Sequence, residues 1–216
     1  MEKLLLGDCT LTLLDERFGL RRIMRCPLLD AWLTARKKMK LSSFERHKVQ
    51  DLQDLLAVNF EGWNEQELAL HFIGPIFSGV NFTEMYRFNL FSQRFVTATI
   101  GNYLVTGKPD GFIASGFREP RKPYFAFNEY KPEVDPDGDP AGQALGAMLI
   151  GQTLNDNEAP IYGCYIIGSN WRFMLLIGKN YCVSEPFSAL TDDVFDIVKI
   201  LKVLKVNLMQ MTTPDV

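Results

Sequence analysis

Hydrophobic positions follow a helical period in the first part of the chain. From residue 8 to about residue 60, apolar side chains recur at steps of three and four residues, and Ser42 or Ser43 is placed to cap a helix. The clearest run is Leu52, Leu55, Leu56 and Phe60. We therefore expect a helical N-terminal extension over residues 1–60.

A second helix is expected to begin near Asn64, whose side chain can cap it. Glu65 and Glu67 follow in the first turn, where acidic side chains favour the positive end of the helix dipole. Gly74-Pro75 is expected to end or kink this helix, because proline lacks an amide donor and clashes with the preceding turn.

The period changes to two between about residue 86 and residue 131. Aromatic and β-branched residues dominate three stretches that glycine and proline separate, which predicts three strands. The stretches are RFVTATIGNYLV, DGFIAS and YFAFNEYK. A helix is then predicted from Pro140 to about residue 154, with Asp139 as its cap and small side chains that let it lie close on a sheet.

Strands and one helix are expected in the last part of the chain. IYGCYIIG and WRFMLLIG are joined through Gly168-Ser169-Asn170, which predicts a hairpin, and YCVSEPF predicts a further strand. A last helix is expected after Thr191. This order of elements predicts an α/β (α+β) fold with a central mixed sheet flanked by helices, in a single domain over residues 1–216.

The charge of the chain restricts how it can bind nucleic acid. With 216 residues and a formal net charge of -3, the protein lacks the overall basicity of a non-specific nucleic-acid coater. Contact with phosphate therefore requires a local basic patch or bound cations. Basic residues are concentrated between residues 21 and 48, and a solvated helical face is the alternative interpretation of that cluster.

Cysteine usage and hydropathy indicate a cytoplasmic protein. The four cysteines form no C-x-x-C pair, and neither His47 nor His71 stands at a metal-ligand spacing from them, so we expect no zinc site. The chain has no run of about 18 apolar residues that could span a membrane, and the apolar run near its start is too short for a signal peptide. We expect reduced thiols and no membrane contact.

Candidate chemistry lies where two predicted strands meet. Alternation in KPYFAFNEYKPE places Phe125, Phe127, Glu129 and Lys131 on one face, and antiparallel pairing would bring Asp110 beside Glu129. Two such carboxylates resist joint ionisation unless a cation lies between them, and Mg²⁺ prefers oxygen ligands. With Lys131 they form a minimal apparatus for phosphodiester hydrolysis, whereas Glu129 and Lys131 alone would indicate only an exposed ion pair.

Pro109-Asp110, followed by Glu129-Tyr130-Lys131, resembles the PD…ExK signature of the PD-(D/E)xK (restriction-endonuclease-like) nuclease superfamily. The resemblance implies a restriction-endonuclease-like core, placed over residues 61–216, that follows the helical lead-in.

Further residues resemble the N-terminal nuclease domain of type I restriction enzyme motor subunits. Glu67 in ELALHFIGPIF resembles the helical glutamate of those domains, and IIGSNWRFMLL resembles their Asn-Gly-x-x-Trp hairpin. Gln143 is similar to the glutamine that often follows the PD…ExK signature. Together with that signature, the resemblance covers residues 64 to 177.

The resemblance implies a role for each of these residues. Asp110 and Glu129 would bind one or two Mg²⁺ ions, with Glu67 as a further ligand or partner, and Mn²⁺ could take the place of Mg²⁺. Lys131 would position or activate the attacking water, and Gln143 would orient the substrate or a ligand.

The function expected on this basis is a metal-dependent DNA endonuclease that serves restriction, defence or repair. A chain this acidic would need a homodimer, a partner subunit or its basic segment to hold DNA. Two alternatives stay open: a non-catalytic module that binds nucleic acid or protein on the same fold, and a nuclease that acts on RNA.

Overall fold

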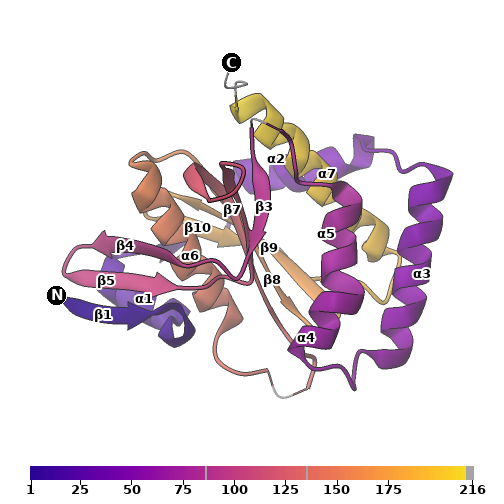
Figure 1. The fold of residues 1–216 in the computed structure, drawn as a ribbon, viewed down its shortest axis with the longest axis horizontal. Helices are drawn as coiled ribbons and strands as arrows, with labels where there is room; N and C mark the ends of the chain where they lie inside the picture. Colours follow the sequence, from indigo (N-terminus) through magenta and orange to yellow (C-terminus); the bar gives the residue numbers. More distant parts are fainter. Residues whose placement is uncertain (86, 135, 213–216) are drawn as a thin grey trace.

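The computed structural model of the chain describes residues 1–85, 87–134 and 136–212; the start of the β-rich region predicted at residue 86 lies outside the described residues. Its centre is a mixed sheet with the strand order β2-β10-β9-β8-β7-β6-β3, and β11 pairs with β9. The predicted fold class, a mixed sheet flanked by helices, is confirmed (Figure 1). The strands of this sheet are β2 (Arg21–Arg22), β3 (Asn89–Ser92), β6 (Gly111–Ser115), β7 (Arg121–Lys131), β8 (Ile161–Ile167), β9 (Asn170–Ile177), β10 (Asn180–Val183) and β11 (Phe187–Ser188).

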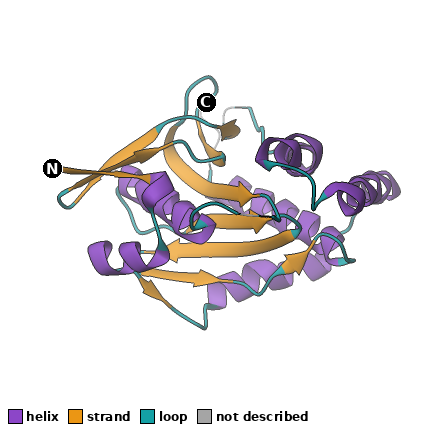
Figure 2. Cartoon of the chain, turned by 90° about the horizontal axis from the view of Figure 1, so that it is seen from below, coloured by secondary structure: helices purple, strands orange, loops and turns teal. Residues whose placement is uncertain are grey.

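Helices cover both faces of the sheet, which separates two hydrophobic cores (Figure 2). One core lies under α6, and the other lies under α2, α3, α5 and α7. Successive residues of β9 show the division, because Phe173 faces the second core and Met174 faces the first. The helices are α1 (Leu11–Phe18), α2 (Pro27–Ala35), α3 (Ser43–Asn59), α4 (Glu65–Leu68), α5 (Gly74–Val80), α6 (Pro140–Asn155) and α7 (Asp193–Met211).

A second, three-stranded sheet corrects two predictions. The stretch RFVTATIGNYLV, expected as one strand, forms a hairpin of β4 (Val96–Ile100) and β5 (Tyr103–Gly107), because Gly101 adopts a left-handed φ of 58° and turns the chain. β1 (Glu2–Leu5) pairs in parallel with β5. The N-terminal region is therefore not helical throughout, since β1 and β2 also belong to it.

The helix predicted to end or kink at Gly74-Pro75 does not end there, because helical structure continues to Val80. A π-helical turn over Ala69–Ile73 precedes the proline, and the Gly74 amide donates to the Ala69 carbonyl in the wider π pattern. A Cβ on Gly74 would lie 2.8 Å from that carbonyl oxygen, so glycine suits this position. The extra residue in the π turn places Pro75 in the first turn of α5, where its missing donor costs little.

Other local predictions are confirmed. The Ser42 side chain caps α3 and, with Glu45, forms a reciprocal capping box. The Asp139 carboxylate accepts a hydrogen bond from the Gly142 amide at 3.0 Å and caps α6. β8 and β9 form the expected antiparallel hairpin through Gly168.

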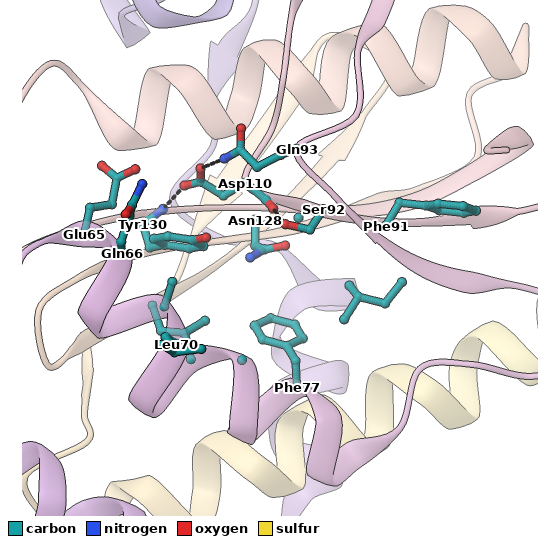
Figure 3. A pocket seen from close by; sticks show the side chains of 15 residues that line it. Glu65, Gln66, Leu70, Phe77, Phe91, Ser92, Gln93, Asp110, Asn128 and Tyr130 are labelled. Carbon is teal, nitrogen blue, oxygen red and sulfur yellow. Dashed lines mark hydrogen bonds between the residues drawn. The ribbon is translucent and has the colours of Figure 1, made fainter. Parts of the chain in front are cut away.

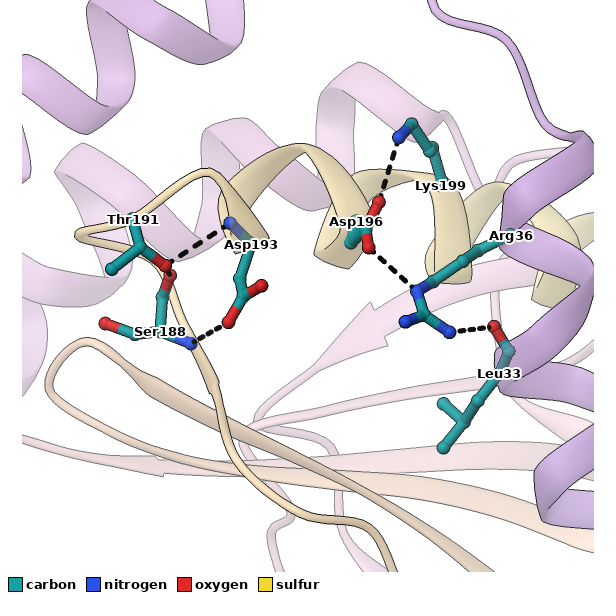
Figure 4. A network of polar contacts seen from close by, with 7 residues as sticks. All are labelled: Leu33, Arg36, Ser188, Thr191, Asp193, Asp196 and Lys199. Carbon is teal, nitrogen blue, oxygen red and sulfur yellow. Dashed lines mark hydrogen bonds and ion pairs between the residues drawn. The ribbon is translucent and has the colours of Figure 1, made fainter.

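Part of the basic N-terminal segment holds the helices together. Arg36 Nε lies 2.9 Å from Asp196 Oδ2 on α7, and its Nη1 donates to the Leu33 carbonyl at 2.6 Å (Figure 4). The Arg46 guanidinium lies 5.2 Å from the centre of the Phe195 ring. These two residues make contacts within the protein, whereas Arg25, Lys37, Lys38 and Lys40 are exposed.

Candidate active site

β6 and β7 bring together the residues of the predicted catalytic core. The strands pair antiparallel with Gly111 opposite Asn128, so Asp110 enters β6 beside the end of β7. The Asp110 Oδ2 atom accepts a hydrogen bond of 2.9 Å from the Tyr130 amide. Asp110 and Glu129 are both buried, with 5% and 7% of their surfaces exposed.

Lys131 contacts two carboxylates, those of Glu129 and Glu65. Its Nζ atom lies 3.3 Å from Glu129 Oε1 and 3.0 Å from Glu65 Oε2 on α4. Three carboxylates and one ammonium group leave two negative charges when all four groups are ionised. We refer to Glu65, Asp110, Glu129 and Lys131 as the carboxylate cluster.

Alternation along β7 differs from the prediction at Phe125. The ladder with β6 shifts register between Ile113 and Ala114. Phe125 therefore packs on Phe88 in the core under α5 and α7, whereas Phe127 stacks on Phe112 in the core under α6. The expected shared face of Phe125 and Phe127 is wrong, because an irregularity in the ladder reverses the side-chain direction.

Burial controls the electrostatics of the cluster. Burial raises the pKa of Asp110 to about 6, although the hydrogen bond from the Tyr130 amide acts to lower this pKa. Burial, and next the charge of Asp110, raises the pKa of Glu129 to about 8. For Lys131, burial acts to lower the pKa, but the hydrogen bond to Glu65 and the nearby carboxylates raise it, so the ammonium stays charged.

Two residues at the end of β3 position Asp110, and neither was predicted from the sequence. The Gln93 Nε2 atom donates to Asp110 Oδ1 at 2.7 Å, and Ser92 Oγ donates to the Asp110 carbonyl at 2.7 Å. Gln93 has a left-handed φ of 53°, which is uncommon outside glycine. No motif marks these residues, because the pairing of β3 with β6 cannot be recognised from spacing alone.

The acidic residue that α4 contributes is Glu65, not Glu67. Glu67 is exposed, and its Oε2 atom accepts from the Asn64 amide at 3.0 Å while its own amide donates to Asn64 Oδ1 at 3.0 Å. This reciprocal capping box occupies Glu67 at the helix start. Glu65 points instead toward Lys131, so the α4 carboxylate that contacts the predicted catalytic residues is Glu65.

Gln143 lies in the first turn of α6, as predicted, and is buried. Its amide nitrogen lies 3.4 Å from the Gly7 carbonyl oxygen. Within the described part of the chain, no hydrogen bond joins it to Asp110, Glu129 or Lys131. Its contact partner is the N-terminal segment, so the structure gives it no direct contact with the cluster.

A pocket of about 630 Å³ adjoins the cluster (Figure 3). Asp110 and Glu65 reach its lining, whereas Glu129 and Lys131 are not among the described residues that line it. The strands contribute Asn128 and Tyr130, and the helix that faces them contributes Leu70 and Phe77 (Figure 3).

The donor chemistry of the cluster fits a divalent cation. Among the described residues, no group of three or more His, Cys, Asp and Glu side chains has an arrangement ready to hold a metal ion. Magnesium, however, usually takes one or two protein carboxylates and keeps several waters. Asp110 and Glu129 supply carboxylates whose mutual repulsion, seen in the raised pKa of Glu129, a cation would relieve.

No protein-family model matches the chain, and no curated protein matches it significantly. Within residues 1–85, 87–134 and 136–212, no helix is both long and apolar enough to cross a membrane. The geometry and chemistry of the site are therefore the basis for a proposal about function.

Proposed function

We propose that this chain is a divalent-metal-dependent endonuclease that hydrolyses phosphodiester bonds of DNA. The observation that supports the proposal best is the carboxylate cluster, in which Asp110, Glu129 and Lys131 converge at the paired ends of β6 and β7. Buried carboxylates destabilise a fold unless they are compensated, and perturbed pKa values in a cleft are typical of functional sites.

Each residue of the cluster has a chemical role in this proposal. A bound Mg²⁺ or Mn²⁺ supplies Lewis acidity and lowers the pKa of a coordinated water. Asp110 and Glu129 would hold the cation. Lys131, oriented by Glu65 and Glu129, would offset the negative charge that develops on the phosphate oxygens and help position the attacking water.

DNA contact and cellular location form part of the same proposal. The exposed basic residues Lys37, Lys38 and Lys40 are available to contact the DNA backbone, alone or with a homodimer or a partner subunit. All four cysteines are free and buried, as suits a protein of the reducing cytoplasm. Restriction, defence or repair are the biological roles that suit such a nuclease.

A cleavage assay tests the proposal. Plasmid DNA and labelled oligonucleotides are incubated with Mg²⁺, Mn²⁺ or EDTA, and the wild type is compared with Asp110→Asn and Lys131→Ala. We expect metal-dependent cleavage that each substitution reduces on the order of 100-fold or more, because each removes a charge that acts in the transition state. Lys3→Ala, an exposed lysine on the three-stranded sheet, is the matched control and keeps full activity.

Three outcomes contradict or redirect the proposal. Equal cleavage by wild type, Asp110→Asn and Lys131→Ala identifies a contaminating nuclease. Metal-dependent retention of DNA without cleavage identifies a non-catalytic binding module. Faster cleavage of labelled RNA than of DNA of the same sequence assigns the activity to RNA.

A further inference from the structure

The pocket beside the carboxylate cluster has a lining that does not suit a phosphate group. Its described lining residues include no Lys, Arg or His, and the charged ones, Glu65 and Asp110, are both acidic. Figure 3 shows these two carboxylates on one side of the pocket and Phe77 on the other. An anion could approach only at the carboxylates, through a bound cation, so the remaining space suits an uncharged group.

Asn128 gives this uncharged space a specific polar contact. Only 7% of its surface is exposed, yet within the described residues its side-chain amide has no hydrogen-bond partner, and it lines the pocket (Figure 3). Gly111 on β6 leaves room for the amide, since a Cβ there would lie 2.3 Å from Asn128 Oδ1. The amide lines the pocket, so it is available to form hydrogen bonds with a ligand there.

The remaining walls suit a planar, apolar surface. The Tyr130 ring lies on the strand side, and Leu70 and Phe77 face it from the helix side (Figure 3). A pocket of about 630 Å³ is within the range of sites for small organic groups. A nucleobase combines these properties, because it has a flat face that stacks on aromatic rings and an edge that an amide can bind on both its donor and acceptor sides.

We propose that this pocket receives the base of an unpaired nucleotide next to the scissile phosphate, an inference that rests on the proposed nuclease function. Asn128 binds the edge of the base, Tyr130 and Phe77 contact its faces, and the phosphate lies at the carboxylate cluster. A paired base stays in its stack and cannot enter the pocket. The substrate class is therefore single-stranded DNA, or duplex DNA that contains an unpaired nucleotide.

Cleavage of three matched substrates tests this inference. The substrates share one sequence and are a single strand, a perfect duplex, and a duplex with one unpaired nucleotide. We expect kcat/KM of the wild type to favour the unpaired substrates on the order of 10-fold, the size of one base-stacking contribution. Asn128→Leu keeps the branched shape of the side chain and removes the hydrogen bonds, so the ratio falls below that of the wild type. Asn207→Leu, an amide on α7 in a different groove, leaves the ratio unchanged.

A binding measurement separates this inference from the nuclease proposal. Fluorescence anisotropy with Ca²⁺ compares a labelled single strand with the same strand carrying one abasic site. Weaker binding of the abasic strand by the wild type, and a smaller difference between the two strands for Asn128→Leu, support the base pocket even if no strand is cut.

Other results of these two experiments overturn the base pocket. One such result is an enzyme that prefers the perfect duplex and that Asp110→Asn inactivates. This result overturns the base pocket but leaves the nuclease proposal intact. Equal binding of both strands by the wild type also overturns it. If circular dichroism shows that Asn128→Leu does not fold, Ala69→Phe takes the place of that variant in both experiments, because the phenylalanine fills the pocket from the helix side.

Discussion

Gln93 Nε2 donates a hydrogen bond of 2.7 Å to the Oδ1 atom of Asp110. The Oδ2 atom of the same carboxylate accepts from the Tyr130 amide at 2.9 Å, so one partner holds each oxygen. The two bonds fix the carboxylate between the end of β3 and the end of β7. Gln93 is therefore a positioning residue for the proposed metal ligand.

Gln93→Asn is expected to weaken the response to metal. Asparagine tolerates the left-handed φ of 53° at this position, but its shorter side chain does not reach Asp110. Loss of a residue that orients a metal ligand typically weakens metal affinity or activity by about 10- to 100-fold. The measurement is the Mg²⁺ concentration that gives half-maximal cleavage, with Gln50→Asn on the exposed face of α3 as the control. An unchanged Mg²⁺ midpoint would mean that Asp110 does not need this hydrogen bond.

Glu65→Gln and Glu67→Gln should have different effects on cleavage. Glu65 contacts Lys131 at 3.0 Å, so removal of its charge should reduce cleavage on the order of 10-fold by releasing the ammonium from its position. Glu67 contacts the Asn64 amide, and glutamine can make the same capping contact, so Glu67→Gln should retain activity and stability. Cleavage rates and thermal melting of both variants are the measurements. A larger loss of cleavage activity in Glu67→Gln than in Glu65→Gln would instead support Glu67, the residue predicted from the sequence, as the glutamate that acts at the site.

The part of the fold set by local chemistry could be predicted from the sequence. The caps at Ser42, Asn64 and Asp139 depend on residues within one helical turn, and the β8–β9 hairpin depends on its own turn. The mixed sheet followed from the order of elements. Contacts that join distant segments could not be predicted in the same way. β1 pairs with β5 across about half of the chain, and no local pattern marks that pairing.

The candidate site shows the same division. Asp110 directly precedes β6, and Glu129 and Lys131 lie on β7, the adjacent strand, whose pairing with β6 follows from a short connection. Gln93 reaches Asp110 only because β3 pairs with β6. The choice between Glu65 and Glu67 depends on which carboxylate caps the helix, and both assignments were compatible with the sequence. The Phe125 side chain changed face because of an irregularity that alternation does not reveal.

The metal-free protein should lose stability as pH rises, and Glu129 should account for part of the loss. Burial raises the pKa of Glu129 to about 8, whereas the unfolded chain has a glutamate pKa of about 4.3. Between these two pKa values the folded state keeps a proton that the unfolded state has released. The contribution of protonated Glu129 to the free energy of unfolding is therefore full below the unfolded pKa and is lost as pH rises through about 8. Urea unfolding in EDTA at several pH values in this range should show a smaller decline for Glu129→Gln than for the wild type.

Addition of Mg²⁺ is the control for this pH dependence. A cation beside the carboxylates favours their ionised forms, so Mg²⁺ should stabilise the wild type more at the alkaline end of the range than at the acidic end. Glu129→Gln should show less of this pH-dependent gain. Parallel pH profiles of the two proteins in EDTA would contradict the raised pKa of Glu129.

Two glycine-to-alanine substitutions should change stability in opposite directions. A Cβ on Gly142 in α6 would lie 2.5 Å from both the Cys9 carbonyl oxygen and the Thr10 Cα atom, and backbone cannot rotate away. Gly142→Ala should therefore lower the free energy of unfolding by about 1–3 kcal/mol. Among the described residues, no such neighbour lies within 4 Å of a Cβ on Gly79 in α5. Gly79→Ala should therefore raise the free energy of unfolding by about 0.5–1 kcal/mol through reduced backbone entropy in the unfolded chain. Urea denaturation of both variants measures the difference. Stabilisation by both would show that the N-terminal segment does not pack closely on α6.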